Sequence, residues 1–309
     1  MSIVADGVRV TVPASAGNLG PGFDTLGMAL GVVDTIEVNL LARPDVEIEV
    51  EGEGADRVPR DESHLFVRAF REAFARVAGE RPGLAIRAVN AIPHGQGLGS
   101  SAATVVAAFA AARAVLGDPD QLATDEILTL ATRFEGHPDN AAPAIYGGAV
   151  VCWQDAAGAH ASPLTIADGI ETAVLIPHGV VPTSEARAAL PEAVPHGDAA
   201  FNASRAALLV HALAGRPELL FDATEDRLHQ GYRAAQMPSA VAMLERLRGD
   251  GLAAVVSGAG PSVLVIGTDL AAAGLDTGPV DWADGVGGDT WRCVLTRERV
   301  PGVTAEALG

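Results

Sequence analysis

The sequence predicts a mixed α+β protein with enough apolar residues for two domains. The chain has 309 residues, of which 49% are hydrophobic, so it can bury one large core or two ordinary ones. Alternating and helical apolar patterns are interspersed along the chain, and their order changes between Trp153 and Ala173. We therefore expect an N-terminal domain over residues 1–160 and a C-terminal domain over residues 161–309.

Strands dominate the beginning of the chain. Residues 8–12 predict a strand, 13–27 a long glycine-rich loop, and 36–42 and 46–50 two strands paired through a tight turn. Ser63 is placed to cap an amphipathic helix whose phenylalanines recur at helical spacing and should face the core. Loops as long as the one over 13–27 are usually functional in compact domains.

The rest of the chain mixes both kinds of element. We expect strands near 84–92, 149–153, 159–164, 172–176, 253–256, 261–267 and 291–296. We expect helices near 100–112, 120–134, 183–190, 198–214, 225–235 and 239–248.

The stretch GQGLGSS, residues 95–101, lies between an expected strand and an alanine-rich helix. Glycines allow close approach to the backbone, and the first turn of a helix offers free N–H groups at its positive end, so this loop favours a phosphate. The alternative is a tight turn in which Ser100 or Ser101 caps the helix. The stretch fits neither GxGxxG nor the P-loop pattern.

Charge and lysine content exclude several functions. The chain has 21 basic and 39 acidic residues and a net charge of −18, which disfavours nucleic acid and anionic membranes as partners. It contains no lysine, which excludes a P-loop lysine, the protein-kinase strand lysine and Schiff-base catalysis. Any bound phosphate must be held by backbone amides, arginine, serine or a metal ion.

Cys152 and Cys293 lie far apart in the sequence and suggest no disulfide framework. The N-terminal residues show no secretory signal, and the longest apolar run near the glycine-rich stretch is too short to span a bilayer. We therefore expect a cytoplasmic protein.

Three glycine-bearing segments follow one another along the chain: NLGPGFD at 18–24, GQGLGSSAA at 95–103 and SGAGPS at 257–262. Their order and spacing resemble those of the GHMP small-molecule kinases, and the resemblance covers nearly the whole chain. Within that superfamily, the stretches PASAGNLGPGFD, EGHPDN, PTSEAR and DRLHQGYR are most similar to the homoserine kinases.

The resemblance implies a two-domain fold, with a ribosomal protein S5 domain 2-like N-terminal domain, a ferredoxin-like C-terminal domain, and commonly a homodimer. It also implies transfer of the γ-phosphoryl group of ATP to the hydroxyl of L-homoserine, on the route to threonine. Two alternatives remain open: a kinase of another small alcohol such as mevalonate or shikimate, and a non-catalytic nucleotide-binding regulator. An acceptor without an ammonium group would make Asp24 a liability.

The resemblance also assigns the nucleotide side of the site. The residues expected to hold ATP are Pro93, Gly95, Gln96, Gly97, Leu98, Gly99, Ser100, Ser101 and Ala102. Mg²⁺ would be held by Glu135 and by a motif serine, of which Ser101 is preferred. Gln96 stands where an arginine is common in the family, and Gly231 replaces a usual proline.

The acceptor side is assigned in the same way. Arg187 and Arg233 would pair with the substrate carboxylate and Asp24 with its ammonium group, while Asn18, Asn140 and Thr183 would lie at the acceptor end. Asn140 stands where related kinases place a catalytic aspartate, so Asn140, Glu135 and Ser101 would assist a transfer without a general base. Asp139 is the rival as base, and His137 is expected to have a structural role. His229 is either a partner of Arg233 or has no role in the site.

Overall fold

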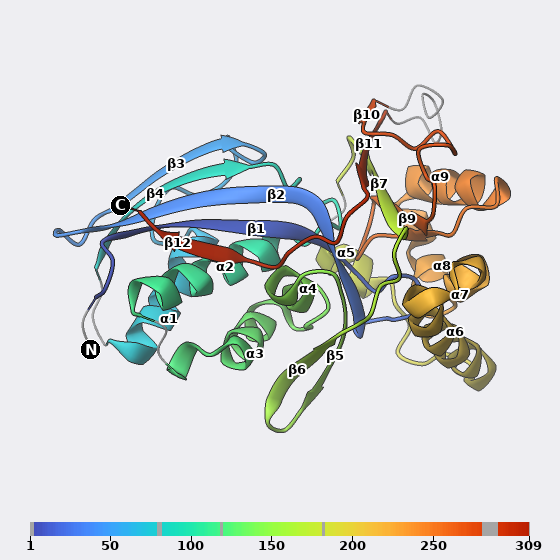
Figure 1. The fold of residues 1–309 in the computed structure, drawn as a ribbon, viewed down its shortest axis with the longest axis horizontal. Helices are drawn as coiled ribbons and strands as arrows, with labels where there is room; N and C mark the ends of the chain where they lie inside the picture. Colours follow the sequence, from blue (N-terminus) through green and yellow to red (C-terminus); the bar gives the residue numbers. More distant parts are fainter. Residues whose placement is uncertain (1–2, 79–81, 118–119, 181–182, 280–289, 309) are drawn as a thin grey trace.

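The computed structural model describes residues 3–78, 82–117, 120–180, 183–279 and 290–308. Within these ranges the strands form a seven-stranded sheet and a five-stranded sheet. The two sheets lie next to each other along the long axis of the molecule, each with its own group of helices (Figure 1). This arrangement confirms the α+β class.

The larger sheet is built mainly from the first half of the chain. Its strands are β1 (Gly7–Gly17), β2 (Leu26–Leu41), β3 (Val46–Gly52), β4 (Gly83–Asn90), β5 (Ala149–Asp155), β6 (Gly158–Pro163) and β12 (Thr304–Ala307). The strand order is β12-β1-β2-β4-β3, with β5 paired to the start of β2 and β6 paired to β5. Only the β3–β4 pair is parallel among these described strands.

Two expectations for this region were wrong. The loop expected over 13–27 is shorter, because Ala14 to Gly17 pair with Gly27 to Leu30 and extend both β1 and β2. The expected pairing of the strands near 36–42 and 46–50 is also wrong, because β4 lies between β2 and β3. A short turn predicts a hairpin, but the helical crossover after β3 brings β4 back into the gap.

Four helices cover one face of the larger sheet (Figure 1): α1 (Leu65–Val77), α2 (Ser100–Val115), α3 (Thr124–Glu135) and α4 (Ala141–Tyr146). Helix α2 is buried on nearly all sides, and its alanines allow close packing against the sheet and against α1 and α3. His64 caps α1, with its Nδ1 accepting the Phe66 N–H at 3.2 Å. The cap expected at Ser63 therefore lies one residue further along.

The smaller sheet comes from the second half of the chain. Its strands are β7 (Glu171–Pro177), β8 (Ala254–Val256), β9 (Val263–Gly267), β10 (Gly278–Pro279) and β11 (Trp291–Thr296), in the order β10-β11-β7-β9-β8 with antiparallel pairing. Its helices are α5 (Thr183–Ala188), α6 (His196–Gly215), α7 (Leu220–Ala223), α8 (Gln230–Arg233) and α9 (Pro238–Gly249).

The helix expected over 225–235 begins later than predicted. Asp226 accepts hydrogen bonds from the N–H groups of Leu228, His229 and Gln230, and these bonds fold the preceding residues into a turn. Helix α8 therefore starts at Gln230.

The end of the chain returns to the larger sheet. Strand β12, which the sequence did not reveal, pairs with β1, so the last strand lies beside the first (Figure 1). Strand β6 belongs to the larger sheet and β7 to the smaller one, and buried residues of both sheets contribute to one apolar cluster. A domain boundary near residue 160 remains a prediction. Among the described residues, no helix has both the length and the apolar character needed to cross a membrane.

A buried carboxylate fixes the segment that leads from the larger sheet to the glycine-rich loop. Asp34 on β2 is 2% exposed, and its Oδ1 accepts the N–H groups of Ala91 at 2.6 Å and Ile92 at 2.8 Å. Burial raises the pKa of Asp34 from 3.8 to about 6, although these two hydrogen bonds oppose the rise.

We predict that Asp34 gives the free energy of unfolding a pH dependence of known sign. A folded-state pKa above the unfolded value favours the native state fully below pH 4, and this contribution is lost as the pH rises through about 6. The full loss is about 3 kcal/mol, of which roughly 1.3 kcal/mol falls between pH 5 and pH 7. Asp34→Asn should remove this slope in denaturant titrations at the two pH values. Parallel pH profiles for both proteins would contradict the prediction.

Candidate active site

The glycine-rich loop packs against the turn at 257–262 of the smaller sheet. Gly95, Gly97 and Gly99 adopt positive φ angles of 71°, 74° and 67°. A Cβ at Gly97 would lie 2.8 Å from the Gly260 nitrogen and closer still to the Ser257 carbonyl oxygen. Ser257 Oγ donates to the Gly97 carbonyl at 2.8 Å. Glycine is therefore required at position 97 both for its backbone angle and for the space that it leaves.

The N-terminus of α2 is free of side-chain caps. Gly99 occupies the N-cap position, and Ser100 and Ser101 are the first two residues of the helix, so neither serine is the cap. The N–H groups of this first turn therefore lack a side-chain acceptor, and they lie at the positive end of the helix dipole. An anion is the natural ligand at such a helix end.

Ser101 faces a carboxylate at the end of the neighbouring helix α3. Its Oγ donates to Glu135 Oε1 at 2.6 Å. Burial raises the pKa of Glu135 above its usual value, and the Ser101 hydrogen bond only partly offsets this. Glu135 forms no ion pair within the described parts of the chain. A serine hydroxyl and a carboxylate without an ion-pair partner in the described residues suit a hard divalent cation.

A pair of arginines lies across the cavity from α2. Arg187 on α5 forms a bidentate ion pair with Asp24, at 2.8 and 3.2 Å. Arg233 on α8 is only 3% exposed and donates to the carbonyl oxygens of Ala186 at 3.0 Å and Gly258 at 3.3 Å. Both guanidinium groups lie over the ring of Phe23, at 5.8 Å and 5.6 Å from its centre.

His229 connects Arg233 to the loop that carries Asp24. Its Nε2 donates to the Gly20 carbonyl at 2.8 Å, so Nδ1 is the acceptor for Arg233, at 3.2 Å. Burial lowers the pKa of His229, which keeps the ring neutral and able to accept this bond. Of the two roles left open for His229, partnership with Arg233 matches the observed contacts.

The EGHPDN segment supplies a polar corner between the loop and the arginines. Asp139 is 1% exposed and is hydrogen-bonded to His137, and Asn140 Nδ2 donates to it at 3.3 Å. Ser15 Oγ donates to Asn140 Oδ1 at 3.1 Å, and Asn18 Nδ2 donates to the Gly258 carbonyl at 2.9 Å. Burial opposes a charge on His137, but the Asp139 hydrogen bond and carboxylate outweigh it and raise the pKa of His137.

These groups surround one cavity of about 280 Å³. Most residues expected in the site line it: Asn18, Asp24, Pro93, Gly95, Gly97, Leu98, Gly99, Ser100, Ser101, Glu135, Asn140, Arg187 and Arg233. Ala102 lies in the core instead, and Gln96 points its amide toward β7. The side chain of Thr183 lies outside the described residues. His137, Asp139 and Phe134 also line the cavity.

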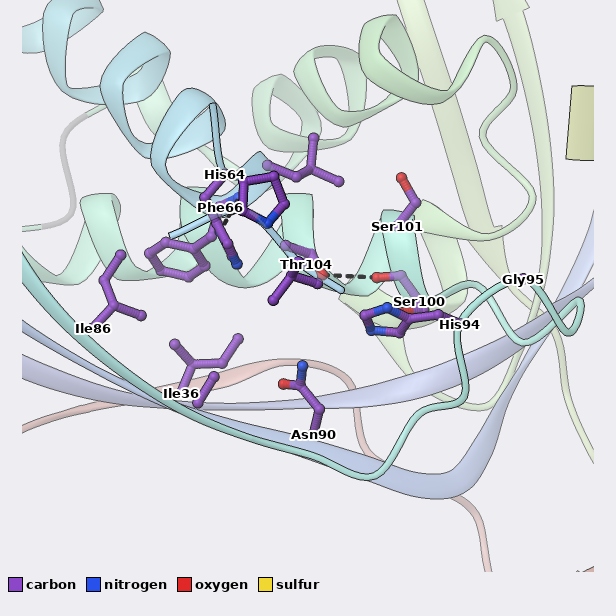
Figure 2. A pocket seen from close by; sticks show the side chains of 14 residues that line it. Ile36, His64, Phe66, Ile86, Asn90, His94, Gly95, Ser100, Ser101 and Thr104 are labelled. Carbon is purple, nitrogen blue, oxygen red and sulfur yellow. Dashed lines mark hydrogen bonds between the residues drawn. The ribbon is translucent and has the colours of Figure 1, made fainter. Parts of the chain in front are cut away.

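A second cavity of about 260 Å³ adjoins the first and shares Gly95, Ser100 and Ser101 with it (Figure 2). Its walls are mainly apolar and come from α1, β2, β4 and the residues before α1. In Figure 2, His94 lies next to Ser100, and Ile36, Ile86 and Phe66 line the far end. No motif in the sequence signals this cavity, because its residues are scattered along the chain and resemble ordinary core residues.

Comparisons with known proteins agree with this arrangement. The GHMP kinase N-terminal domain family matches residues 64–148, and the GHMP kinase C-terminal family matches residues 204–275. The chain is thus a GHMP kinase, with both domains of that class.

Relatives narrow the assignment. A homoserine kinase from Streptomyces coelicolor is 49% identical over 93% of this chain and 90% of its own length. A homoserine kinase from Clavibacter michiganensis is 50% identical over 85% of this chain and 83% of its own length. The chain belongs to the homoserine kinase family. A homoserine kinase crystal structure from Cytophaga hutchinsonii, at 24% identity, shares the fold with a TM-score of 0.85 over 99% of both chains.

We predict that Gly97→Ala lowers the free energy of unfolding by at least about 2 kcal/mol, because the new Cβ meets backbone atoms at a positive φ. Gly231→Ala is the matched control, since nothing lies within 4 Å of its Cβ position and it sits in a helix. The control should change stability by no more than about 0.5 to 1 kcal/mol, in the stabilising direction. Denaturant titrations measure both, and equal stabilities would contradict the packing described here.

Proposed function

We propose that this chain transfers the γ-phosphoryl group of ATP to the side-chain hydroxyl of L-homoserine and forms O-phospho-L-homoserine, a step toward threonine. One observation carries the proposal. A single cavity joins an uncapped helix N-terminus to two arginines and an aspartate, which are the groups that a phosphate and a zwitterionic amino acid require. The names of the relatives at about half identity support the same acceptor.

ATP would occupy both cavities, which meet at the start of α2. The triphosphate would lie over residues 95–101, where loop amides and the helix dipole replace the missing lysine. The nucleoside would enter the apolar cavity of Figure 2, whose volume of about 260 Å³ suits a planar base. The γ-phosphate then faces the arginines and Asn140 across the first cavity.

Ser101 and Glu135 would hold Mg²⁺, because they place two oxygen ligands beside the phosphate loop and Glu135 forms no salt bridge among the described residues. When bound, the ion neutralises charge on the β- and γ-phosphates. Ser101 and Glu135 also fix each other's orientation through their hydrogen bond. The donor set therefore fits the metal that the reaction needs.

The acceptor half offers complementary charges to homoserine. Arg187 and Asp24 are partly exposed, with side chains 45% and 31% accessible, so opening their ion pair costs little. The carboxylate of homoserine would bind Arg187 and Arg233, and the ammonium group of homoserine would bind Asp24. Ligand atoms of Asp24, His137 and Asp139 lie within 4.8 Å of one another, so two carboxylates meet at the corner where the ammonium group would bind.

Asn140 and Asn18 would orient the acceptor hydroxyl toward the γ-phosphate. The hydroxyl proton would pass to a phosphate oxygen as the new bond forms, without a general base. Asp139 is already engaged by His137 and Asn140, which supports a positioning role for this carboxylate. Thr183 stays a predicted neighbour of the acceptor. A homodimer, a cytoplasmic location and domains divided near residue 160 are further parts of the proposal.

The direct test incubates the purified protein with Mg·ATP and, separately, L-homoserine, L-threonine, mevalonate and shikimate. Phosphorus NMR should detect a phosphate monoester, with the fastest formation from L-homoserine. Faster turnover of an acceptor that lacks an ammonium group would contradict the role of Asp24. Nucleotide binding without an ester from any acceptor would favour a non-catalytic regulator.

We also predict the effect of replacing Asp139, the candidate general base. Asp139→Asn should retain turnover within about tenfold of the wild type, because the hydroxyl proton does not pass through this residue. Circular dichroism and L-homoserine affinity serve as controls for folding and binding. A loss of about 100-fold or more in kcat with both controls unchanged would identify Asp139 as the base.

A further inference from the structure

Gln96 lies within the phosphate loop, but its side chain leaves the site. The residue is 9% exposed and stands between two glycines with positive φ. Its Nε2 donates to the carbonyl oxygens of Pro177 at 2.8 Å and Gly179 at 3.3 Å, at the end of β7. The amide thus joins the nucleotide loop to the smaller sheet.

The backbone around Gln96 reaches the same sheet at another point. The Ser262 N–H donates to the Gln96 carbonyl at 3.3 Å, and Ser257 Oγ donates to the Gly97 carbonyl at 2.8 Å. Two segments of the smaller sheet, one after β7 and one between β8 and β9, therefore hold the loop together. A shift of the loop would therefore disturb its hydrogen bonds to both segments of the smaller sheet.

The first helix after β7 belongs to the acceptor half. Helix α5 begins four residues after Gly179 and carries Arg187, which pairs with Asp24. The Ala186 carbonyl accepts from Arg233 at 3.0 Å. Arg187 and Arg233 are therefore joined through α5, the helix that follows β7 in the chain.

We propose that Gln96 is a positioning residue that couples the nucleotide half of the site to the acceptor half. The inference rests on the proposed function, because it concerns ATP and L-homoserine. A nucleotide that orders the loop fixes the Gln96 amide, the amide fixes the end of β7, and α5 then holds Arg187 in place for the substrate carboxylate. By linkage, the acceptor tightens the nucleotide by the same factor.

The hydrogen bonding of Gln96 favours a role in coupling the two halves of the site over a role in stabilising the fold. Its Oε1 is buried and has no hydrogen-bond partner among the described residues. Such an orphaned acceptor opposes the gain from the donor side, so the side chain contributes little net stability. Only the N–H donors are used, and any residue that supplies donors at this point should preserve the coupling.

The test uses Gln96→Met, which keeps the length and removes the donors, and Gln96→Arg, which restores N–H donors. Gln154→Met, at an exposed position on β5, is the matched control. Calorimetry measures the affinity for a non-hydrolysable Mg·ATP analogue with and without L-homoserine. It also measures the affinity for L-homoserine with and without the analogue. The wild type and Gln154→Met should show at least about fivefold mutual enhancement.

Gln96→Met should reduce the mutual enhancement below about twofold, and Gln96→Arg should recover at least part of it. Gln96→Asn, whose amide is one methylene too short, replaces the methionine variant if that variant unfolds. Full enhancement in Gln96→Met, or in Gln96→Asn where it replaces that variant, or no enhancement in the wild type, overturns the inference. Turnover of L-homoserine by the wild type is assayed in parallel, so that failure of the proposed function is recognised separately.

Discussion

The contact between the glycine-rich loop and the 257–262 turn is the constraint on which the site depends. Gly97 has no room for a side chain there, and Ser257 bonds to its carbonyl oxygen. The same turn presents the Gly258 carbonyl to Asn18 and Arg233. One backbone junction therefore aligns the phosphate loop of the larger sheet with the acceptor groups held by the smaller one.

Local electrostatics explains how a chain with a large negative net charge can bind a polyanion. The net charge is −18 and there is no lysine, so positive potential must be concentrated locally. It comes from the uncapped end of α2 and from two arginines, one of them buried and held by carbonyl oxygens and a neutral histidine. Glu135 and Asp24 add carboxylates at the two points where a metal ion and an ammonium group would bind.

The sequence predicted the parts of the site whose chemistry is local. Glycines that need positive φ, a serine at a helix start and a carboxylate at a helix end are visible in short motifs, and the structure brings most of them to one cavity. The apolar cavity next to α2 was missed because packing, and not a motif, creates it. The direction of Gln96, the place of β4 between β2 and β3, and the return of β12 depend on contacts between distant segments. Local patterns carry no information about such contacts.

The most direct measurement of the central claim is a crystal structure with a non-hydrolysable ATP analogue, Mg²⁺ and L-homoserine bound together. The account predicts the triphosphate over residues 95–101, the ion on Ser101 and Glu135, and the homoserine carboxylate on Arg187 and Arg233, with the hydroxyl facing the γ-phosphate beside Asn140. Nucleotide bound away from the start of α2, or homoserine bound without either arginine, would contradict it.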